Sequence, residues 1–353
     1  MTGGRIKPDA LLDFSTALMA AHGVDQAQSS EVARNMIWSE LVGRENFGLS
    51  RLPLYLERVR AGGLNCPCTP RLDETTTGTA LLDADGGFGQ YAGRLGMEHA
   101  IAMARQHGTG TVGVRNSNFF GTGAYFVHLA ADAGMIGLAM SNSFPKVAAH
   151  GGLKPVLGTN PFAFGAPRQN GESLMFDMAT SALAGSTVRA HKASSEPLPE
   201  GLAIDGVGNP VTDPAKVDDG ALLPAGGAKG YGLALFVELL AGVITGAGVS
   251  TGVASMYKDV DQAGRNGHFF MAIDISRFLP MESYYQRLEG LVSLLKASQP
   301  NGEVLLPGET RWDTYKANSS AGIELAAETR AQLERLNVSH GISPPWSQPV
   351  RAA

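Results

Sequence analysis

Short apolar runs of strand length alternate with amphipathic segments of helix length through the middle of the chain, and this alternation most limits the possible folds. Strands that alternate with helices build a sheet covered by helices rather than a bundle or a sandwich. The predicted strands are Thr79–Asp83, Thr111–Val114, Met135–Asn142, Gly158–Gly165, Leu174–Met178 and Gly267–Ile275, and the predicted helices between them include Gly93–His107, Thr122–Gly134 and Ser181–Ala193. We therefore predict a mixed α/β domain.

Both ends of the chain are predicted to be helical. Apolar residues recur near helical spacing over Lys7–Ala21, from Ser30 onward and from Leu52 onward. Beyond Pro280 the two longest candidates are Tyr284–Lys296 and Ser320–Leu336. We divide the chain into a helical N-terminal part (residues 1–75), a central mixed α/β domain (76–280), and a helical C-terminal part (281–353) that packs with the N-terminal part.

Charge and cysteine content argue against several classes of protein. A net charge of −5 over 353 residues, with no run of Lys or Arg, provides no basic surface for nucleic acid. Cys66 and Cys68 are too close in sequence for an unstrained disulfide, and no second Cys/His cluster completes a metal site. We expect no bound metal and a reducing cytoplasmic environment.

No targeting or membrane segment is expected. Asp9 and Asp13 interrupt the N-terminal apolar stretch, so it does not match a secretion signal. The long apolar run Gly230–Val249 contains Glu238 in its middle and many small residues. This run predicts a buried core helix rather than a membrane span.

Two glycine-rich segments are not phosphate-binding motifs. Gly108–Gly113 matches G-x-G-x-x-G, but here a helix ends and a strand begins, which is the reverse of the dinucleotide-binding context. Lys229 follows Ala228 and precedes Gly230, so it does not fit a Walker-type loop either. We interpret the first segment as a helix C-cap followed by a turn.

Three polar stretches are candidates for an active site. The first, Val114–Gly123, is an amide-rich loop between a buried strand and an amphipathic helix, and the others are Glu45–Arg51 and Met175–Ser181. Polar loops carried by a rigid apolar framework are where catalytic groups concentrate. We predict that these stretches together form the site of a nicotinamide-dependent oxidoreductase.

Ordered motifs extend this interpretation over nearly the whole chain. They are VRNSNFFGTGAYF from Val114, SNSFPKVAAHGG from Ser141, LGTNPFAFGAP from Leu157, FDMATS from Phe176, GGAKGYGLAL from Gly226 and LLPGE from Leu305. Together they resemble the malate/L-lactate dehydrogenase family that lacks a Rossmann fold. That family includes ureidoglycolate and sulfolactate dehydrogenases and Δ1-piperideine-2-carboxylate reductases.

The resemblance implies a homodimer in which an unusual mixed-sheet domain binds NAD(H) or NADP(H), with a helical domain formed by both chain ends. The cofactor-binding residues that it implies are Ser141, Asn160, Met178, Thr180, Ser181, Lys229, Gly230, Pro307, Gly308 and Glu309. A lysine beside glycines suits a pyrophosphate, because both the backbone and the ammonium can approach it.

The resemblance also implies which residues meet a small carboxylate substrate. Arg51 resembles the carboxylate clamp of the family, and a guanidinium fork suits a planar carboxylate. Asp177 is a candidate to orient a polar group, with capping of a helix as the alternative role. The remaining substrate-side candidates are Asn46, Phe47, Tyr55, Asn118, Phe119 and Thr159.

Phe47 and Phe119 depart from the family pattern, because the family usually has a histidine at each position. A phenyl ring cannot transfer a proton. Reduction of a ketone needs a proton on the developing alkoxide, whereas an imine can be reduced as an already protonated iminium. This difference favours a C=N substrate. Replacement donors are Lys146 and His150, with Tyr55 and Tyr125 as further candidates.

Three hypotheses therefore stand. The first is an NAD(P)H-dependent reductase of a small 2-imino or 2-oxo carboxylate, the second is a 2-hydroxy-acid dehydrogenase with a substitute proton donor, and the third is a cofactor-binding homologue without redox activity. A basic cluster of Arg189, His191 and Lys192 slightly favours NADPH, because it could pair with a 2′-phosphate; a solvated helix face is the alternative interpretation.

Overall fold

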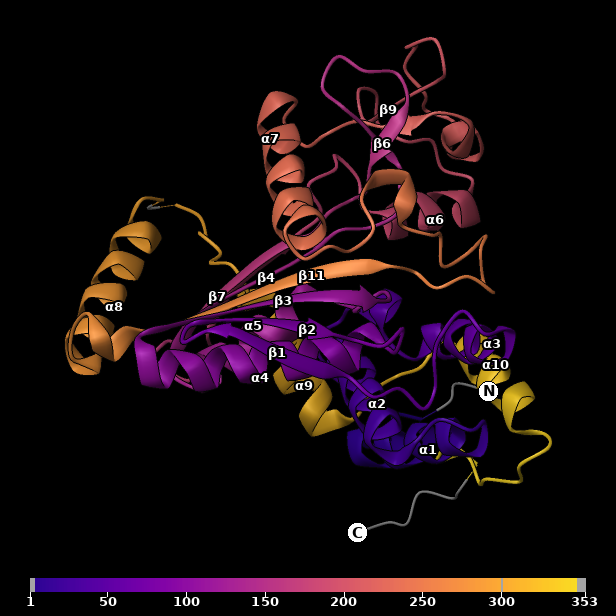
Figure 1. Ribbon diagram of the computed structural model, residues 1–353, viewed down its shortest axis with the longest axis horizontal. Coiled ribbons are helices and arrows are strands. Elements are labelled where there is room, and N and C mark those ends of the chain that lie inside the picture. The colour runs from indigo at the N-terminus through magenta and orange to yellow at the C-terminus, as the bar shows by residue number, and fades with distance from the viewer. Residues whose placement is uncertain (1–3, 300, 348–353) are drawn as a thin grey trace.

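The centre of the protein is a seven-stranded sheet, seen edge-on in the computed structural model, which describes residues 4–299 and 301–347 (Figure 1). Its strand order is β1-β2-β3-β11-β4-β7-β8, and among the described strands of this sheet only β2 and β3 pair in parallel. The strands are β1 (Arg71–Thr76), β2 (Thr79–Asp83), β3 (Thr109–Ser117), β4 (Met135–Ser141), β7 (Phe162–Ala166), β8 (Leu174–Met178) and β11 (Asn266–Asp274). A mainly antiparallel sheet with this order is not a Rossmann fold, as predicted.

Helices α4 (Gly89–His107) and α5 (Gly123–Asp132) cover the lower face of this sheet in Figure 1. The helix predicted from Gly93 begins four residues earlier, at Gly89. Close packing explains the glycines on α4, because a Cβ on Gly93 would lie 2.6 Å from Phe126 and one on Gly96 would lie 2.7 Å from Phe270. Gly108 caps this helix with φ +90°, and β3 follows directly, so the G-x-G-x-x-G segment is a cap and a strand.

The upper face carries α7 (Ala228–Val237) and the π-helix η4 (Glu238–Val243), which together contain most of the predicted Gly230–Val249 core helix. The buried Glu238 carboxylate accepts hydrogen bonds from Asn160 Nδ2 (2.7 Å) and from the Ser250 amide (2.8 Å). Across the described residues, no helix is long and apolar enough to cross a membrane.

A smaller four-stranded sheet of order β6-β5-β10-β9 lies beyond α7. Its strands are β5 (Val147–Ala148), β6 (Pro155–Leu157), β9 (Ala203–Ile204) and β10 (Ala221–Leu222), and α6 (Gly185–Ser194) packs beside it. The predicted strand Gly158–Gly165 starts too early, because residues 158–161 connect β6 of this sheet to β7 of the large sheet, where the strand begins at Phe162.

The two chain ends meet through the antiparallel pair Ile6 and Ile323. The helices α1 (Pro8–Ala21), α2 (Gln26–Leu41), α3 (Leu52–Ala61), α9 (Glu309–Ala321) and α10 (Ala327–Asn337) lie in this region (Figure 1). The predicted single helix Ser320–Leu336 is wrong. Gly322 has φ +89° and ends α9, and the chain extends through Ile323 before α10 begins.

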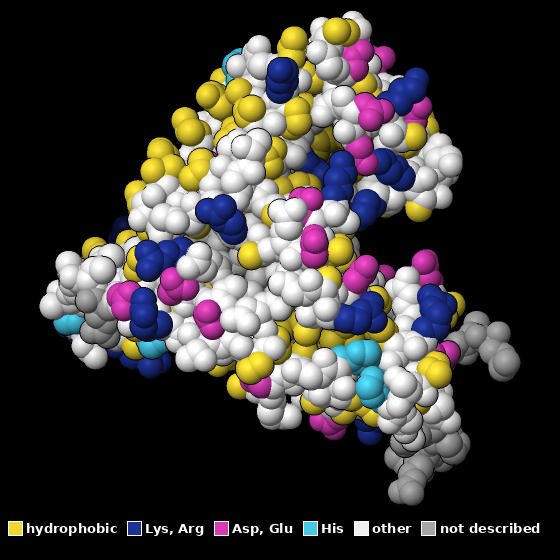
Figure 2. All heavy atoms as spheres, turned by 45° about the vertical axis from the view of Figure 1, so that its right-hand side comes forward, with side chains coloured by type: hydrophobic (Ala, Val, Ile, Leu, Met, Phe, Trp, Pro, Cys, Tyr) yellow, Lys and Arg dark blue, Asp and Glu magenta, His cyan; other side chains and the backbone are white. Residues whose placement is uncertain are grey.

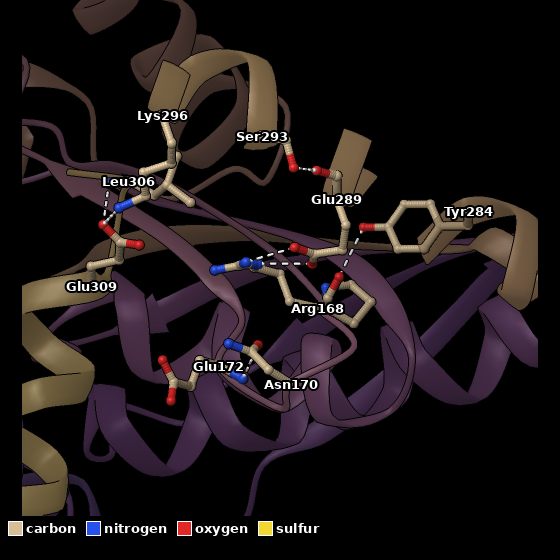
Figure 3. Close-up of polar contacts among 10 residues, drawn as sticks. Arg168, Asn170, Glu172, Tyr284, Glu289, Ser293, Lys296, Leu306 and Glu309 are labelled. Carbon is tan, nitrogen blue, oxygen red and sulfur yellow. Dashed lines mark hydrogen bonds and ion pairs between the residues drawn. The ribbon is translucent and has the colours of Figure 1, made fainter. Parts of the chain in front are cut away.

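Helix α8 (Met281–Ala297) lies at the opposite end of the large sheet from the N-terminal helices (Figure 1). Figure 3 shows its polar anchors: Arg168 forms a two-pronged ion pair with Glu289 (3.0 and 2.7 Å), and the Tyr284 hydroxyl donates to the Pro167 carbonyl. Helices α9 and α10 of the C-terminal region pack against the N-terminal helices α2 and α3, respectively.

Candidate active site

A cavity of about 370 Å³ opens where loops at one end of the large sheet face the N-terminal helical region. From outside it lies in a deep notch with basic side chains along the upper wall (Figure 2). The three predicted polar stretches meet in it through Asn46, Phe47, Arg51, Phe119–Gly123, Asp177–Ala179 and Ser181. The end of β4, helix α6 and the segment 254–257 before β11 complete its walls.

Phe47 and Phe119 form an aromatic wall of this cavity. Their rings lie nearly parallel, with centroids 6.1 Å apart and an interplanar angle of 12°. The Arg51 guanidinium carbon lies 6.0 Å from the Phe119 centroid. Phe47 and Phe119 thus contribute a joint apolar surface beside a cation.

Arg51 is 8% exposed and is held by two short hydrogen bonds. Its Nε donates to the Asn46 carbonyl and its Nη1 donates to the Tyr257 hydroxyl, both at 2.6 Å. Within the described residues it has no carboxylate partner. Its Nη2 group is therefore available to an anion in the cavity.

Asp177 organises the loop after β3. Its Oδ2 accepts from the Thr122 hydroxyl (2.6 Å) and from the Ala124 amide (3.0 Å), so it caps the N-terminus of α5. The alternative role for Asp177 was expected at the next helix of the chain, but the helix that it caps, α5, precedes it.

Arg311 from α9 reaches the same end of the cavity and was missed by the sequence motifs. It is 8% exposed, and its Nη1 has no hydrogen-bond partner in the described part of the chain. Burial lowers the pKa of its guanidinium, while the nearby Asp177 charge opposes that shift. A buried, unsatisfied donor lining a cavity is a position for an anionic or carbonyl group of a ligand.

Lys146 also lines the cavity, as proposed for a substitute proton donor. Burial lowers the pKa of its ammonium, and the Asp218 carboxylate, 3.7 Å from Nζ, opposes that shift. Asp218 pairs more closely with Lys192, at 2.6 Å. The predicted basic cluster is Arg189, His191 and Lys192. His191 lies beside the Glu196 carbonyl, and Arg189 is the residue of the cluster that lines the cavity.

Several predicted substrate-side residues do not line the cavity because their polar groups serve the fold. Tyr55 is buried, and its hydroxyl accepts from Gln90 Nε2 (2.8 Å). The Asn118 side-chain amide nitrogen donates to the Gly86 and Gly87 carbonyls. Its oxygen accepts from the Gly264 amide and from the buried Arg58. His150 is exposed outside the cavity and near Gly227.

The predicted cofactor residues divide in the same way. Ser141, Thr159, Met178, Ser181 and Arg189 line the cavity. Asn160 and Thr180 are buried and hold neighbouring backbone, and Lys229 is exposed on the first turn of α7 beside Gly230. The turn Pro307–Glu309 lies against the edge strand β8: the Met175 amide donates to the Pro307 carbonyl, and Glu309 pairs with Lys296 (Figure 3).

His268 is a buried polar residue that the motifs did not identify. Its ring nitrogens lie 2.8 Å from the hydroxyls of Ser141 and Ser117, and the ring stacks on Phe120. Complete burial lowers its pKa to about 3, so it is neutral and holds β3 and β4 together behind the cavity wall. A histidine in the interior of the mainly apolar strand Asn266–Asp274 was the available signal.

The sequence profile described as malate/L-lactate dehydrogenase matches residues 6–334. The chain belongs to this family. It is 36% identical over 346 residues to the malate dehydrogenase of Pyrococcus horikoshii, covering 94% of each protein. It is 36% identical over 333 residues to the ureidoglycolate dehydrogenase (NAD(+)) of Escherichia coli K12, covering 92% of this chain and 95% of the relative.

Among solved structures, the Δ1-piperideine-2-carboxylate reductase of Pseudomonas syringae superposes with a TM-score of 0.87 at 31% identity, covering 94% of this chain and 99% of the other. Membership of the malate/L-lactate dehydrogenase family confirms the predicted family, the mixed α/β fold and the class of enzyme, an oxidoreductase.

Proposed function

We propose that this enzyme is an NADH- or NADPH-dependent reductase of a small 2-imino or 2-oxo carboxylate. The observation that supports this most directly is Arg51, a buried guanidinium that lines the cavity without a carboxylate partner. A guanidinium in that state attracts a carboxylate and donates charge-assisted hydrogen bonds to it from its available Nη2 group. The adjacent Phe47–Phe119 wall accommodates the apolar remainder of the substrate.

The cavity suits a nicotinamide dinucleotide. Ser141, Thr159 and Ser181 place neutral hydroxyl groups along its wall, and the small Ala184 and Gly185 leave room for a flat ring or a phosphate. When bound, the cofactor supplies the hydride. Lys192 is paired with Asp218, so Arg189 is the residue of the basic cluster that could bind a 2′-phosphate in the cavity. One arginine does not distinguish the two cofactors strongly, so we propose that either NADH or NADPH can bind.

The two phenylalanines favour an imine over a ketone, because neither can give a proton to an alkoxide. The second candidate function, a 2-hydroxy-acid dehydrogenase, is supported by Lys146, whose ammonium lines the cavity with a lowered pKa. A cofactor-binding homologue without redox activity is the third.

We further propose a homodimer in the cytoplasm. Helices α7 and η4 expose a row of large apolar side chains: Leu235, Phe236, Leu239, Val243 and Ile244, which are 42–63% exposed. Such a continuous apolar surface on an enzyme suits a two-fold interface. The free thiols of Cys66 and Cys68 suit a reducing compartment.

A substrate panel tests the proposal. Purified protein is titrated with NADH and NADPH by fluorescence, and absorbance is then followed with cyclic 2-imino acids and with 2-oxo acids, with and without amines. We expect turnover of imino acids to exceed that of oxo acids. Turnover of oxo acids alone contradicts the imine preference, and cofactor binding without any turnover supports the homologue without redox activity.

An Arg51→Lys variant tests the carboxylate clamp. A lysine ammonium cannot bond the Asn46 carbonyl, the Tyr257 hydroxyl and a carboxylate in one planar arrangement, so KM for the carboxylate substrate should rise roughly 10- to 100-fold. Arg60→Lys on the exposed face of α3 is the matched control. An unchanged KM in the Arg51 variant would place the substrate carboxylate elsewhere.

A further inference from the structure

Tyr257 lies at the cavity on a turn just before β11. The turn is closed by Asp259, whose Oδ2 accepts from the Ser255 amide and whose own amide donates to the Ser255 carbonyl, both at 2.9 Å. The Tyr257 ring packs edge-on against Phe144, with centroids 6.0 Å apart. The side chain lines the cavity and stays 37% exposed.

Two guanidinium groups flank the Tyr257 ring. The Arg51 and Arg189 guanidinium carbons lie 5.6 and 5.1 Å from its centroid. Because Arg51 Nη1 donates to the phenol oxygen at 2.6 Å, the phenol hydrogen is directed away from that bond and is available to a ligand.

The chemistry of the substrate places its reacting atom beside this hydroxyl. In a 2-oxo or 2-imino acid, the C2 oxygen or nitrogen is attached to the carbon next to the carboxylate. A group that binds the carboxylate and a group that protonates the C2 heteroatom must therefore be neighbours. Arg51 and Tyr257 meet this requirement, since they are joined by a hydrogen bond.

We propose that Tyr257 is the proton donor of this enzyme, replacing the two histidines lost at Phe47 and Phe119. The proposal rests on the proposed reductase function. With a 2-oxo acid, hydride from the reduced nicotinamide dinucleotide forms the new C–H bond at C2, and the C=O electron pair moves onto oxygen. That oxygen takes the proton from Tyr257 Oη, giving a hydroxyl group. The phenolate then regains a proton from water at the exposed edge of the ring.

With an uncharged imine, the same hydroxyl protonates the nitrogen to an iminium before hydride adds, and the product is an amine. A substrate that is already an iminium in solution needs no proton from the enzyme. Tyr257 thus matters most for the oxo acid and least for the protonated imine.

The other candidate donors are less well placed. Lys146 Nζ lies 3.7 Å from the Asp218 carboxylate and over the Phe144 ring, 5.5 Å from its centroid. The Tyr55 hydroxyl is buried against Gln90, and His150 is exposed outside the cavity. Tyr125 is buried, and its hydroxyl donates to Glu31 Oε1 at 2.7 Å.

A Tyr257→Phe variant removes one oxygen and keeps the ring between the two arginines. We expect kcat for a 2-oxo acid to fall roughly 100-fold or more, with KM changed by less than about threefold and cofactor affinity unchanged. Lys146→Met should reduce kcat far less. Tyr285→Phe on α8, far from the cavity, is the matched control and should match the wild type.

Failure of this proposal is distinguishable from failure of the proposed function. If the wild type reduces a 2-oxo acid and Tyr257→Phe does so at an equal kcat, Tyr257 is not the donor. If the wild type reduces only imino acids, the variant should lose kcat at a pH where the imine is mostly unprotonated and keep it where the iminium predominates. Equal loss at both pH values contradicts the proposal. A wild type inactive on both classes overturns both proposals.

Discussion

Glu40 is the buried carboxylate that fixes the loop bearing Phe47 and Arg51. It is 4% exposed, and its Oε1 accepts from the Leu49 amide at 2.8 Å. The carboxylate packs so closely on Gly48 that a Cβ there would lie 2.1 Å from Oε1. Burial raises the pKa of Glu40 from 4.5 to about 7, with the Leu49 hydrogen bond opposing the shift.

This raised pKa makes the stability of the fold depend on pH. The folded form holds the Glu40 proton more tightly than the unfolded chain, so the contribution is full below pH 4.5 and is lost as pH rises through about 7. Glu40→Gln keeps an acceptor for Leu49 but does not titrate. Its free energy of unfolding relative to wild type should therefore rise between ~pH 5 and ~pH 8, by up to about 3 kcal/mol.

Urea unfolding at both pH values measures this difference. Glu57→Gln on α3, an exposed carboxylate, is the control and should show no such trend. A Glu40→Gln difference that stays constant with pH would mean that this carboxylate is not protonated in the folded protein near neutrality.

At the scale of elements, α8 depends on a small number of polar anchors. One face of the helix exposes Leu291, Leu294 and Leu295, and a single residue, Val292, is fully buried among those described in the helix. The two-pronged Arg168–Glu289 pair and the Tyr284–Pro167 hydrogen bond join it to the loop after β7 (Figure 3). Arg168 is the less exposed partner of that pair, at 11%.

Arg168→Met should loosen α8 without unfolding the sheet. Loss of two charge-assisted hydrogen bonds from a mostly buried arginine should speed amide exchange in Met281–Ala297 roughly tenfold. Hydrogen-exchange mass spectrometry measures the exchange rate of each helix separately. Arg287→Met, an exposed arginine on the same helix, is the control, and equal exchange in both variants would show that apolar contacts hold α8.

At the scale of the whole molecule, the large sheet separates two different surfaces. Helices α4 and α5 bury its lower face, whereas the outer side of α7 and η4 on its upper face stays apolar and exposed. The proposed homodimer would cover that outer side. Its burial would contribute to association in proportion to the apolar area removed from water.

Phe236→Lys should convert such a dimer to a monomer, because a charge would be buried at the centre of the interface. Light scattering after gel filtration should give twice the chain mass of 36.9 kDa for wild type and a single chain mass for the variant. Val207→Lys changes a 76% exposed residue in the loop after β9 and should leave the dimer intact. A wild-type mass of one chain would contradict the dimer.

The sequence by itself determined the fold class, the family and the three stretches that meet at the cavity. Periodicity and ordered motifs are properties of short stretches, so they can be recognised in the sequence without knowing which distant segments are in contact. Its errors were also local: the strand predicted from Gly158 begins only at Phe162, and the helix predicted from Ser320 begins only at Ala327. In each case a residue with positive φ, Asn160 or Gly322, interrupts a pattern that otherwise continues.

Only the tertiary structure decided what each polar side chain does. Asn118 and Tyr55 look like site residues in the motifs, yet each is occupied by partners far away in sequence. Tyr257 has no motif of its own and gains its place from a hydrogen bond to Arg51, 206 positions earlier. A hydrogen bond or a buried charge depends on which distant segments pack together, and that packing is a property of the fold rather than of any stretch of sequence.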